Sequence, residues 1–340
     1  MNYVPVLRWK RGEQEALKML SEDIKHEVVP LIDFPTKSKM DSPRLTNFVK
    51  TAVECIGVEK PFYIDFSKVE ITPVCKPNCL YSLLQSVKEN SLEVIPIIST
   101  HLASFFKESI ISSLKSNFCS TLAFRMSEND SESVMNSIIK DSLQDTNLSL
   151  EQTDLIIDLG NISERNITAK KRSLNSMLSN INTNHKNIIV ISGAIPQNNN
   201  FVATDSTALI PRSDWNFWRK IHSDPSTKNI IFGDFTTTPC EIADVPYQGA
   251  PKIKYTLNDK WFVSKGHRPR SADNQRIKQS QAVIKQPFYR GKDYSFGDSR
   301  IYLCAIGSWG PGNPTNWVTN DINQHITFSE SQVSSILSVP

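Results

Sequence analysis

The chain has 340 residues, of which 39% are hydrophobic and 9% are aromatic, so global disorder is excluded and a sizeable core is expected. Residues 1–20 contain no apolar leader segment, and no apolar run approaches the roughly 18 residues of a membrane span, which excludes a membrane class. Six scattered cysteines are too few for a secreted disulfide scaffold, so we expect a cytoplasmic protein with reduced thiols.

Eight short apolar runs with helical stretches between them organise the chain. Hydrophobic residues are continuous within each run and do not alternate with polar residues, which is typical of parallel strands buried on both faces. Eight strand–helix repeats can close into a (β/α)8 TIM-barrel-like fold, whose sites lie at the carboxyl ends of the strands. The runs are residues 3–7, 28–32, 62–64, 94–98, 122–124, 155–157, 188–191 and 230–232.

The choice of the first barrel strand has one alternative. Residues 3–7 include Pro5, which cannot donate to a strand ladder, and residues 252–256 could replace them in the barrel. We favour residues 3–7 over 28–32 as the first strand, because their spacing to the next run suits one short helical crossover. Residues 252–256 and 260–265 then form a hairpin outside the barrel.

Helices are expected between the strands, and a different kind of segment follows the last one. We assign residues 1–240 to the barrel and 241–340 to a basic, Gly- and Pro-containing α+β elaboration that packs on it rather than folding alone. The expected helices are residues 14–20, 42–56, 80–88, 101–114, 131–143, 163–178, 215–221 and 272–285.

Four aspartates directly follow apolar strands, and they are the candidate catalytic residues. In one barrel they would converge on one rim, where carboxylates can bind Mg²⁺ or Mn²⁺, at Asp33 and Asp234 above all, or act as acid and base. Lys10, Arg125 and Arg212 could hold an anionic substrate there. The alternative is architectural, with these acids capping helices or forming structural ion pairs. The four are Asp33, Asp65, Asp158 and Asp234.

Several common catalytic and ligand-binding motifs are absent from the sequence. The six histidines do not fall directly at strand ends, and the sequence contains no nucleophile elbow, P-loop or dinucleotide-binding glycine fingerprint. Cys75 and Cys79 form a lone C-x3-C motif, without the second pair of a zinc finger, and we expect them to be unpaired thiols.

The positive charge is concentrated between residues 252 and 292. This stretch holds eleven Lys or Arg against two Asp, which gives +9 locally and −6 elsewhere for the total of +3. Aromatic residues lie among the cations, as in single-strand nucleic-acid binding. The alternative is a solvated face with the aromatics turned into the core. The candidate anion-binding residues are Lys265, Arg268, Arg270 and Arg276.

A turn-rich stretch, residues 310–317, precedes the amide-rich residues 323–325, and we interpret it as a loop folded across the barrel mouth. Here the chain resembles the beta protein family, named for a T-even phage protein. The resemblance rests on YVPVLRWK at residues 3–10, VPLID at 29–33, PRSDW at 211–215 and GDF at 233–235, and it extends to residues 312–325.

The resemblance implies roles for particular residues and a setting for the protein. It adds weight to Lys10, Glu13, Asp33, Arg212, Asp234 and Trp317 as pocket residues, and Asn323 and His325 also match the family pattern. The chain departs from that pattern at Asn316, Val318 and Gln324, where the family typically has Thr, Arg and His. The family occurs in phage and in bacterial defence-associated loci, so the resemblance implies a role in phage–host conflict.

Two functional hypotheses follow. In the first, an antiviral-defence protein binds a phosphorylated ligand, a nucleotide or nucleic-acid end, in the barrel-top pocket and acts on it by metal-assisted phosphoester hydrolysis. In the second, the barrel is not catalytic and senses a phage component, a nucleic acid or a protein partner from the same locus.

Overall fold

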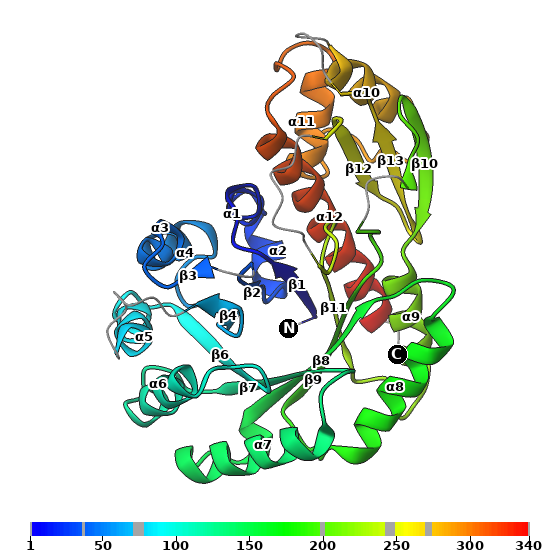
Figure 1. Cartoon of the computed structure of the whole chain (residues 1–340). Coiled ribbons are helices and arrows are strands. Elements are labelled where there is room, and N and C mark those ends of the chain that lie inside the picture. The colour runs from blue at the N-terminus through cyan, green and yellow to red at the C-terminus, as the bar shows by residue number, and fades with distance from the viewer. Residues whose placement is uncertain are drawn as a thin grey trace.

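The computed structural model describes residues 2–35, 38–70, 78–197, 201–241, 249–268 and 274–338. Eight parallel strands form a closed barrel in the order β1-β11-β9-β8-β7-β6-β4-β2, and β2 pairs back with β1 (Figure 1). The eight predicted strands and the (β/α)8 fold class are therefore confirmed. The strands are β1 Tyr3–Leu7, β2 Leu31–Asp33, β4 Pro61–Asp65, β6 Glu93–Ser99, β7 Leu122–Ser127, β8 Thr153–Asn161, β9 Asn187–Gly193 and β11 Ile231–Asp234.

Both faces of the barrel wall are apolar. Alternate residues such as Val6, Leu31 and Ile97 fill the interior, while their neighbours Leu7 and Ile32 pack outward against the helices. This double burial explains why the strands read as unbroken hydrophobic runs.

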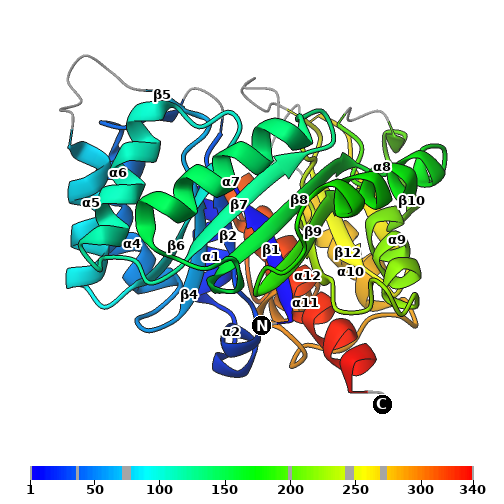
Figure 2. The same ribbon diagram turned by 90° about the horizontal axis from the view of Figure 1, so that it is seen from below.

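Helices surround the barrel, as Figure 2 shows from below. The predicted helix at 42–56 is divided in two at Asn47, which ends one helix and begins the next. The helices of this ring are α1 Arg11–Lys18, α2 Glu22–Glu27, α3 Pro43–Thr46, α4 Phe48–Cys55, α5 Cys79–Glu89, α6 Ser104–Lys115, α7 Glu132–Thr146, α8 Ile167–Asn180 and α9 Ser213–His222, with the short strands β3 Ser38–Lys39 and β5 Val69–Glu70 paired beside them.

A second, antiparallel sheet lies outside the barrel. Its order is β10 (Ser206–Pro211), β13 (Lys260–Lys265) and β12 (Lys252–Thr256). The predicted hairpin is β12–β13, and β1 holds its place in the barrel, as expected. However, β10 precedes the last barrel strand in the chain and still pairs with β13 along its whole length. The elaboration therefore draws on both sides of residue 240, and it also contains α10 (Gln275–Ile284) and α11 (Phe296–Ala305).

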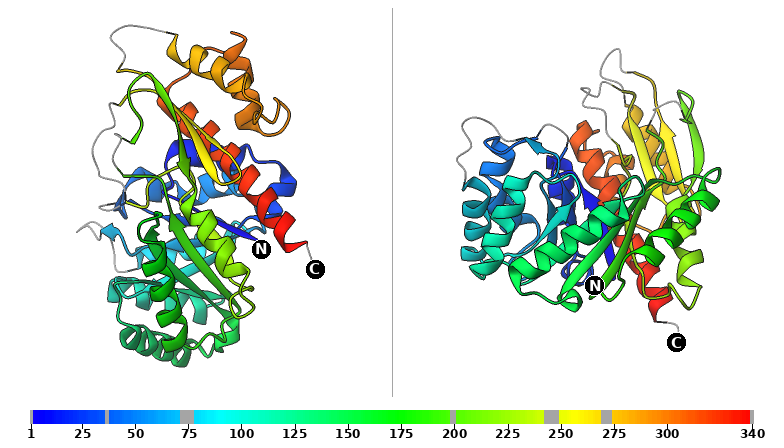
Figure 3. Two further views of the ribbon diagram at one scale, coloured as in Figure 1. Left: turned by 90° about the vertical axis from the view of Figure 1, so that its right-hand side faces the viewer. Right: turned by 60° about the horizontal axis from the view of Figure 1, so that its bottom comes forward.

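The last helix, α12 (Pro314–Leu337), corrects our interpretation of the turn-rich stretch as a loop across the mouth. Asn313 caps this helix by accepting from the backbone N–H of Asn316 at 3.1 Å, and Pro314 occupies its first position. The helix packs against α1, β1 and β12, beside the N-terminal segment (Figure 3). The C-terminal segment thus covers part of the barrel wall itself.

Candidate functional site

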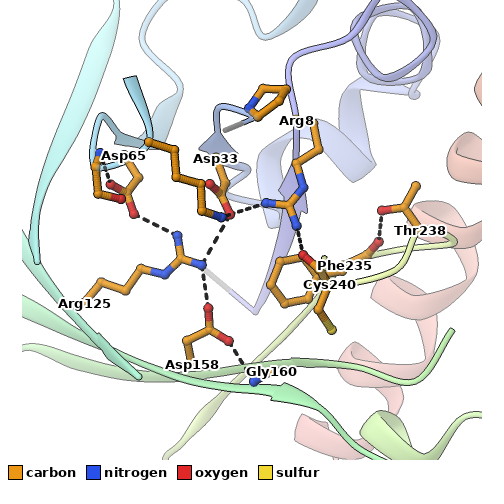
Figure 4. A network of polar contacts seen from close by, with 12 residues as sticks. Arg8, Asp33, Asp65, Arg125, Asp158, Gly160, Phe235, Thr238 and Cys240 are labelled. Atoms are coloured by element: carbon orange, nitrogen blue, oxygen red, sulfur yellow. Dashed lines mark hydrogen bonds and ion pairs between the residues drawn. The ribbon is translucent and has the colours of Figure 1, made fainter. Parts of the chain in front are cut away.

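The carboxyl ends of the strands carry a ring of inward-facing polar side chains. The alternation that points Val6, Leu31 and Ile97 inward continues two residues further along each strand. In six consecutive strands of the barrel this places polar side chains around the mouth and brings opposite charges together (Figure 4). The charged and polar members are Arg8, Asp33, Asp65, Ser99, Arg125 and Asp158, and we call them the mouth ring.

Arg125 links the three predicted strand-end acids that lie inside the barrel. Its Nη1 donates to Asp65 Oδ2 at 2.8 Å, and its Nη2 lies 2.5 Å from Asp158 Oδ2 and 3.3 Å from Asp33 Oδ2. Burial alone would lower the pKa of Arg125, but the three carboxylates raise it well above its usual value. The convergence expected for Asp33, Asp65 and Asp158 is therefore present, with an arginine at its centre.

Asp33 receives two further cations. Arg8 forms an ion pair with Asp33 Oδ2 and also donates to the carbonyl of Cys240, and Lys68 Nζ lies 3.0 Å from the same carboxylate oxygen. Burial alone would raise the pKa of Asp33, but Arg125, Arg8 and Lys68 hold it well below its ordinary value. Asp33 is thus a fixed anion at neutral pH rather than a group that exchanges protons.

Two buried oxygens of the mouth ring lack partners. Asp33 Oδ1 and Ser99 Oγ accept or donate no hydrogen bond within the part of the chain that the structure describes. The ring meets solvent at Asp158, which is 16% exposed, and beside it at Lys68, which pairs with Asp33 and whose side chain is 36% exposed. A buried polar atom normally has a partner, so these oxygens mark where a ligand group would be accommodated.

Asp234 lies on the other side of the barrel wall. Asp234 stands two residues after Phe232 on the same strand, so its side chain also points outward. Its carboxylate accepts from the Tyr3 hydroxyl at 2.6 Å and lies 2.8 Å from His325 Nε2 on α12. The expectation that all four aspartates share one rim is therefore wrong for Asp234. Its carboxylate is sealed between β1, β11 and α12.

His325 is a neutral partner in this buried site. Burial lowers its pKa, so the ring is uncharged, with Nε2–H donating to Asp234 and Nδ1 accepting from the Thr256 hydroxyl at 3.0 Å. Ser329 Oγ lies 3.3 Å from the same Nε2 that serves Asp234. In a nucleophilic triad, one ring nitrogen faces the acid and the other faces the nucleophile, whereas here Nε2 faces both Asp234 and Ser329. All three side chains are also buried, so they do not form a nucleophilic triad.

Arg212 also belongs to this buried site rather than to the mouth. It immediately precedes α9 and donates to Ser329 Oγ at 2.9 Å, to Gln332 at 2.6 Å and to the carbonyl of Leu257 at 3.0 Å. Arg212 therefore fixes α12 and the β12–β13 turn to the barrel. Burial and the nearby charge of Asp234 raise the pKa of Asp214 to about 7.

The residues do not fit the predicted metal site. Asp33 and Asp234 face opposite sides of the barrel wall and cannot share an ion, and the mouth carboxylates already bind arginine. In the described ranges, no group of three His, Cys, Asp or Glu side chains is arranged to hold a metal ion. We therefore assign no step to Mg²⁺ or Mn²⁺.

Most other predicted ligand-binding residues hold helices together. Glu13 is buried and accepts from the backbone N–H of Lys10 at 2.8 Å, while the Lys10 side chain is exposed. Trp317 Nε1 donates to the carbonyl of Pro311 at 2.7 Å, and Asn323 donates to the carbonyl of Ala16 at 3.1 Å. These contacts join α12 to α1 and to the preceding loop.

Part of the basic segment contributes to the core. Tyr255, Trp261 and Phe262 are buried, so they offer no open stacking faces. Lys265 donates to the carbonyl of Val202 at 2.8 Å, and Arg276 donates to the carbonyl of Lys252 and stacks on Trp317. Of the four candidate anion-binding residues, Arg268 is exposed, and Arg270 lies outside the described residues.

The cysteine expectation needs a correction. Cys79, at the start of α5, is disulfide-bonded, so it is not a free thiol, whereas Cys75 lies outside the described residues. Cys55, Cys119, Cys240 and Cys304 are free.

Sequence reasoning missed Arg8, Lys68 and Ser99. For Arg8 and Ser99 the signal was available, because each stands two residues beyond an inward-facing apolar residue of its strand. Lys68 comes from the loop after β4, whose path the sequence pattern does not define.

No curated protein sequence matches the chain. In the described residues, no helix has the length and apolarity needed to cross a membrane. The family model described as "Beta protein" matches residues 3–329, which is nearly the whole chain. The chain therefore belongs to the beta protein family.

Proposed function

We propose that the barrel mouth is a recognition site for a small phosphorylated ligand that also carries hydrogen-bond donors, as a nucleotide or nucleic-acid end does. The observation that carries the proposal is Asp33 Oδ1, a buried carboxylate oxygen without a partner among the described residues. A hydroxyl or amino group of a ligand would satisfy this oxygen, and Ser99 Oγ offers a second polar contact on the same ring.

The charge distribution of the mouth favours a ligand with both donor and anionic groups. Two arginines of the ring (Arg8 and Arg125) and Lys68 at its solvent edge meet three carboxylates, so the group as a whole is close to neutral. Lys68 stands at the solvent edge, where a phosphate could reach it without losing all of its own hydration. The donor groups of the ligand would then point inward and the phosphate outward.

Recognition is better supported than hydrolysis. The low pKa of Asp33 leaves it no proton to give and little tendency to take one at neutral pH, because three cations stabilise its charge. Asp65 and Asp158 are likewise fixed to Arg125. A sensor-like barrel agrees with this rigid network, and its setting in phage–host conflict remains the expectation drawn from family resemblance.

Isothermal titration calorimetry with 5′-phosphorylated mono- and dinucleotides tests the proposal. We expect saturable binding that weakens about tenfold or more in Lys68→Gln, since a charge-assisted contact is lost. The matched control is Lys60→Gln. Lys60 pairs with Glu22 at the beginning of β4, whereas Lys68 follows the end of β4. If no nucleotide binds, or if both variants weaken binding equally, the mouth is not the recognition site.

A further inference from the structure

A cavity of about 580 Å³ lies between α1, α11 and the beginning of α12, among the helices outside the barrel wall. Its size falls in the range of small-molecule sites. The lining includes Arg11 and Glu15 from α1, Phe296 and Arg300 from α11, and Trp309 and Asn320. Neither the mouth ring nor the buried Asp234 site contributes to it.

The cations of this cavity differ from those of the mouth. Neither Arg11 nor Arg300 forms an ion pair within the ranges that the structure describes, whereas Arg8 and Arg125 do. The Arg300 guanidinium is held between two rings, 4.9 Å from the Phe296 centroid and 5.0 Å from that of Trp309. This stacking orients the guanidinium and leaves its N–H groups for a ligand oxyanion.

A buried amide also lines the cavity. Asn320 is only 1% exposed, and its Nδ2 has no hydrogen-bond partner among the described side chains and backbone. Gly297 brings α11 this close to α12, because a Cβ there would lie 2.2 Å from the Asn320 carbonyl oxygen. An unpaired buried donor at the cavity wall requires an acceptor, which a ligand oxygen or ring nitrogen would supply.

The loop before α12 shapes the remaining wall. Gly312 has φ +62, a conformation that favours glycine, and a Cβ there would lie 3.0 Å from Trp309 Cη2. The loop can therefore fold closely against the Trp309 ring. The turn-rich stretch thus forms a wall of this cavity.

From these features we infer that the cavity binds a small ligand in which an oxyanion is joined to a planar ring. Arg11 and Arg300 hold the oxyanion, the Phe296 and Trp309 rings and the stacked guanidinium hold the ring, and Asn320 Nδ2 donates to an acceptor on it. The oxyanion can be a phosphate or a carboxylate, since both suit a guanidinium fork. This site is independent of the one proposed at the barrel mouth.

Tryptophan fluorescence tests this inference, because Trp309 lines the cavity. Four probes separate the contribution of the ring to binding from that of the anion: AMP, indole-3-acetate, adenosine and inorganic phosphate. We expect AMP or indole-3-acetate to give a saturable signal that is reduced in Trp309→Phe, and we expect the ring alone and the anion alone to bind about tenfold or more weakly. Binding of AMP alone would indicate a phosphate joined to a purine as the ligand class, and binding of indole-3-acetate alone a carboxylate joined to an indole.

Variants assign the binding to the cavity. Arg300→Gln and Asn320→Ala should each weaken it about tenfold or more, while Arg219→Gln, an exposed arginine on α9, should leave it unchanged. Lys68→Gln should also leave it unchanged, so failure here is distinguishable from failure of the mouth proposal. The inference is overturned if none of the four probes saturates, or if Arg300→Gln and Asn320→Ala, both with wild-type melting temperatures, bind as the wild type does.

Discussion

Asp33 and Asp234 carry the same signature in the sequence, an aspartate directly after a buried strand, but they occupy opposite sides of the barrel wall. Asp33 faces inward and meets Arg8, Arg125 and Lys68 at an opening to solvent. Asp234 faces outward and is completely buried with neutral partners, Tyr3 and His325.

The role of each aspartate is therefore decided by whether its position along the strand is odd or even, that is, by its parity. Successive side chains of a strand point to opposite faces, so a shift of one position moves an acid from the mouth to the helix interface. The mouth network is built from ion pairs, and two of its oxygens have no partner among the residues that the structure describes. The Asp234 carboxylate is bound by the neutral donors Tyr3 and His325, and this site, to which Arg212 also belongs, fastens α12 to the barrel.

The largest expected effect comes from removing the centre of the mouth ring. Arg125→Met would leave three carboxylates without their shared partner, and a broken buried ion pair costs about 3–5 kcal/mol. Urea unfolding measures this loss in the free energy of unfolding. A change below about 1 kcal/mol would show that the ring does not contribute to stability as a buried network does.

A smaller loss is expected at the outer site. Asp234→Asn keeps the shape of the side chain but weakens the bonds from Tyr3 and His325, at a cost of about 1–3 kcal/mol. Nucleotide binding at the mouth should remain as in the wild type when it is measured below the melting temperature. Loss of binding without loss of stability would instead make Asp234 part of the ligand site.

The pH dependence of stability distinguishes the sites further. The pKa of Asp214 is raised from 3.8 to about 7, so the folded state binds a proton that the unfolded state releases between those values. This group therefore lowers stability as pH rises from about 4 to about 7, and the loss is complete above pH 7. Asp214→Asn removes the titrating carboxyl group and, with it, this pH-dependent loss of stability.

Chemical unfolding of Asp214→Asn and the wild type at matched pH values checks this sign. The difference in unfolding free energy should shift in favour of the variant between pH 4 and 7 and then level off. A difference that does not vary with pH would mean that the pKa of Asp214 is not raised. For Asp33, whose pKa is lowered, the stabilising contribution is instead lost only on acidification below its ordinary value.

The smallest effect on stability is expected at the solvent edge. Lys68 is 36% exposed, so Lys68→Gln should change the free energy of unfolding by less than about 1 kcal/mol. Its effect on ligand affinity should be larger than its effect on stability. Thermal melts with and without nucleotide compare the two, and a variant that melts early but binds normally would reverse this assignment.

Much of the barrel could be predicted from the sequence, because strands buried on both faces leave continuous apolar runs. The same pattern located Asp33, Asp65 and Asp158 at one rim. It did not separate Asp234 from them, since the position of an acid after a strand was noted without its parity.

Other features depend on long-range packing. The pairing of β10 with β13 joins segments about fifty residues apart, and no local pattern specifies it. The helix α12 could have been predicted from the sequence, because Asn313 and Pro314 form a helix start and Ile322 and Ile326 share a face. The glycines before it directed our interpretation toward a loop.

The most direct test of the mouth proposal is a crystal structure of the chain with a bound 5′-phosphorylated nucleotide. We expect a ligand donor within hydrogen-bond distance of Asp33 Oδ1, a phosphate oxygen near Lys68, and Arg125 still bound to its carboxylates. Asp33 Oδ1 paired with a group of the chain itself, with the nucleotide bound elsewhere, would contradict it.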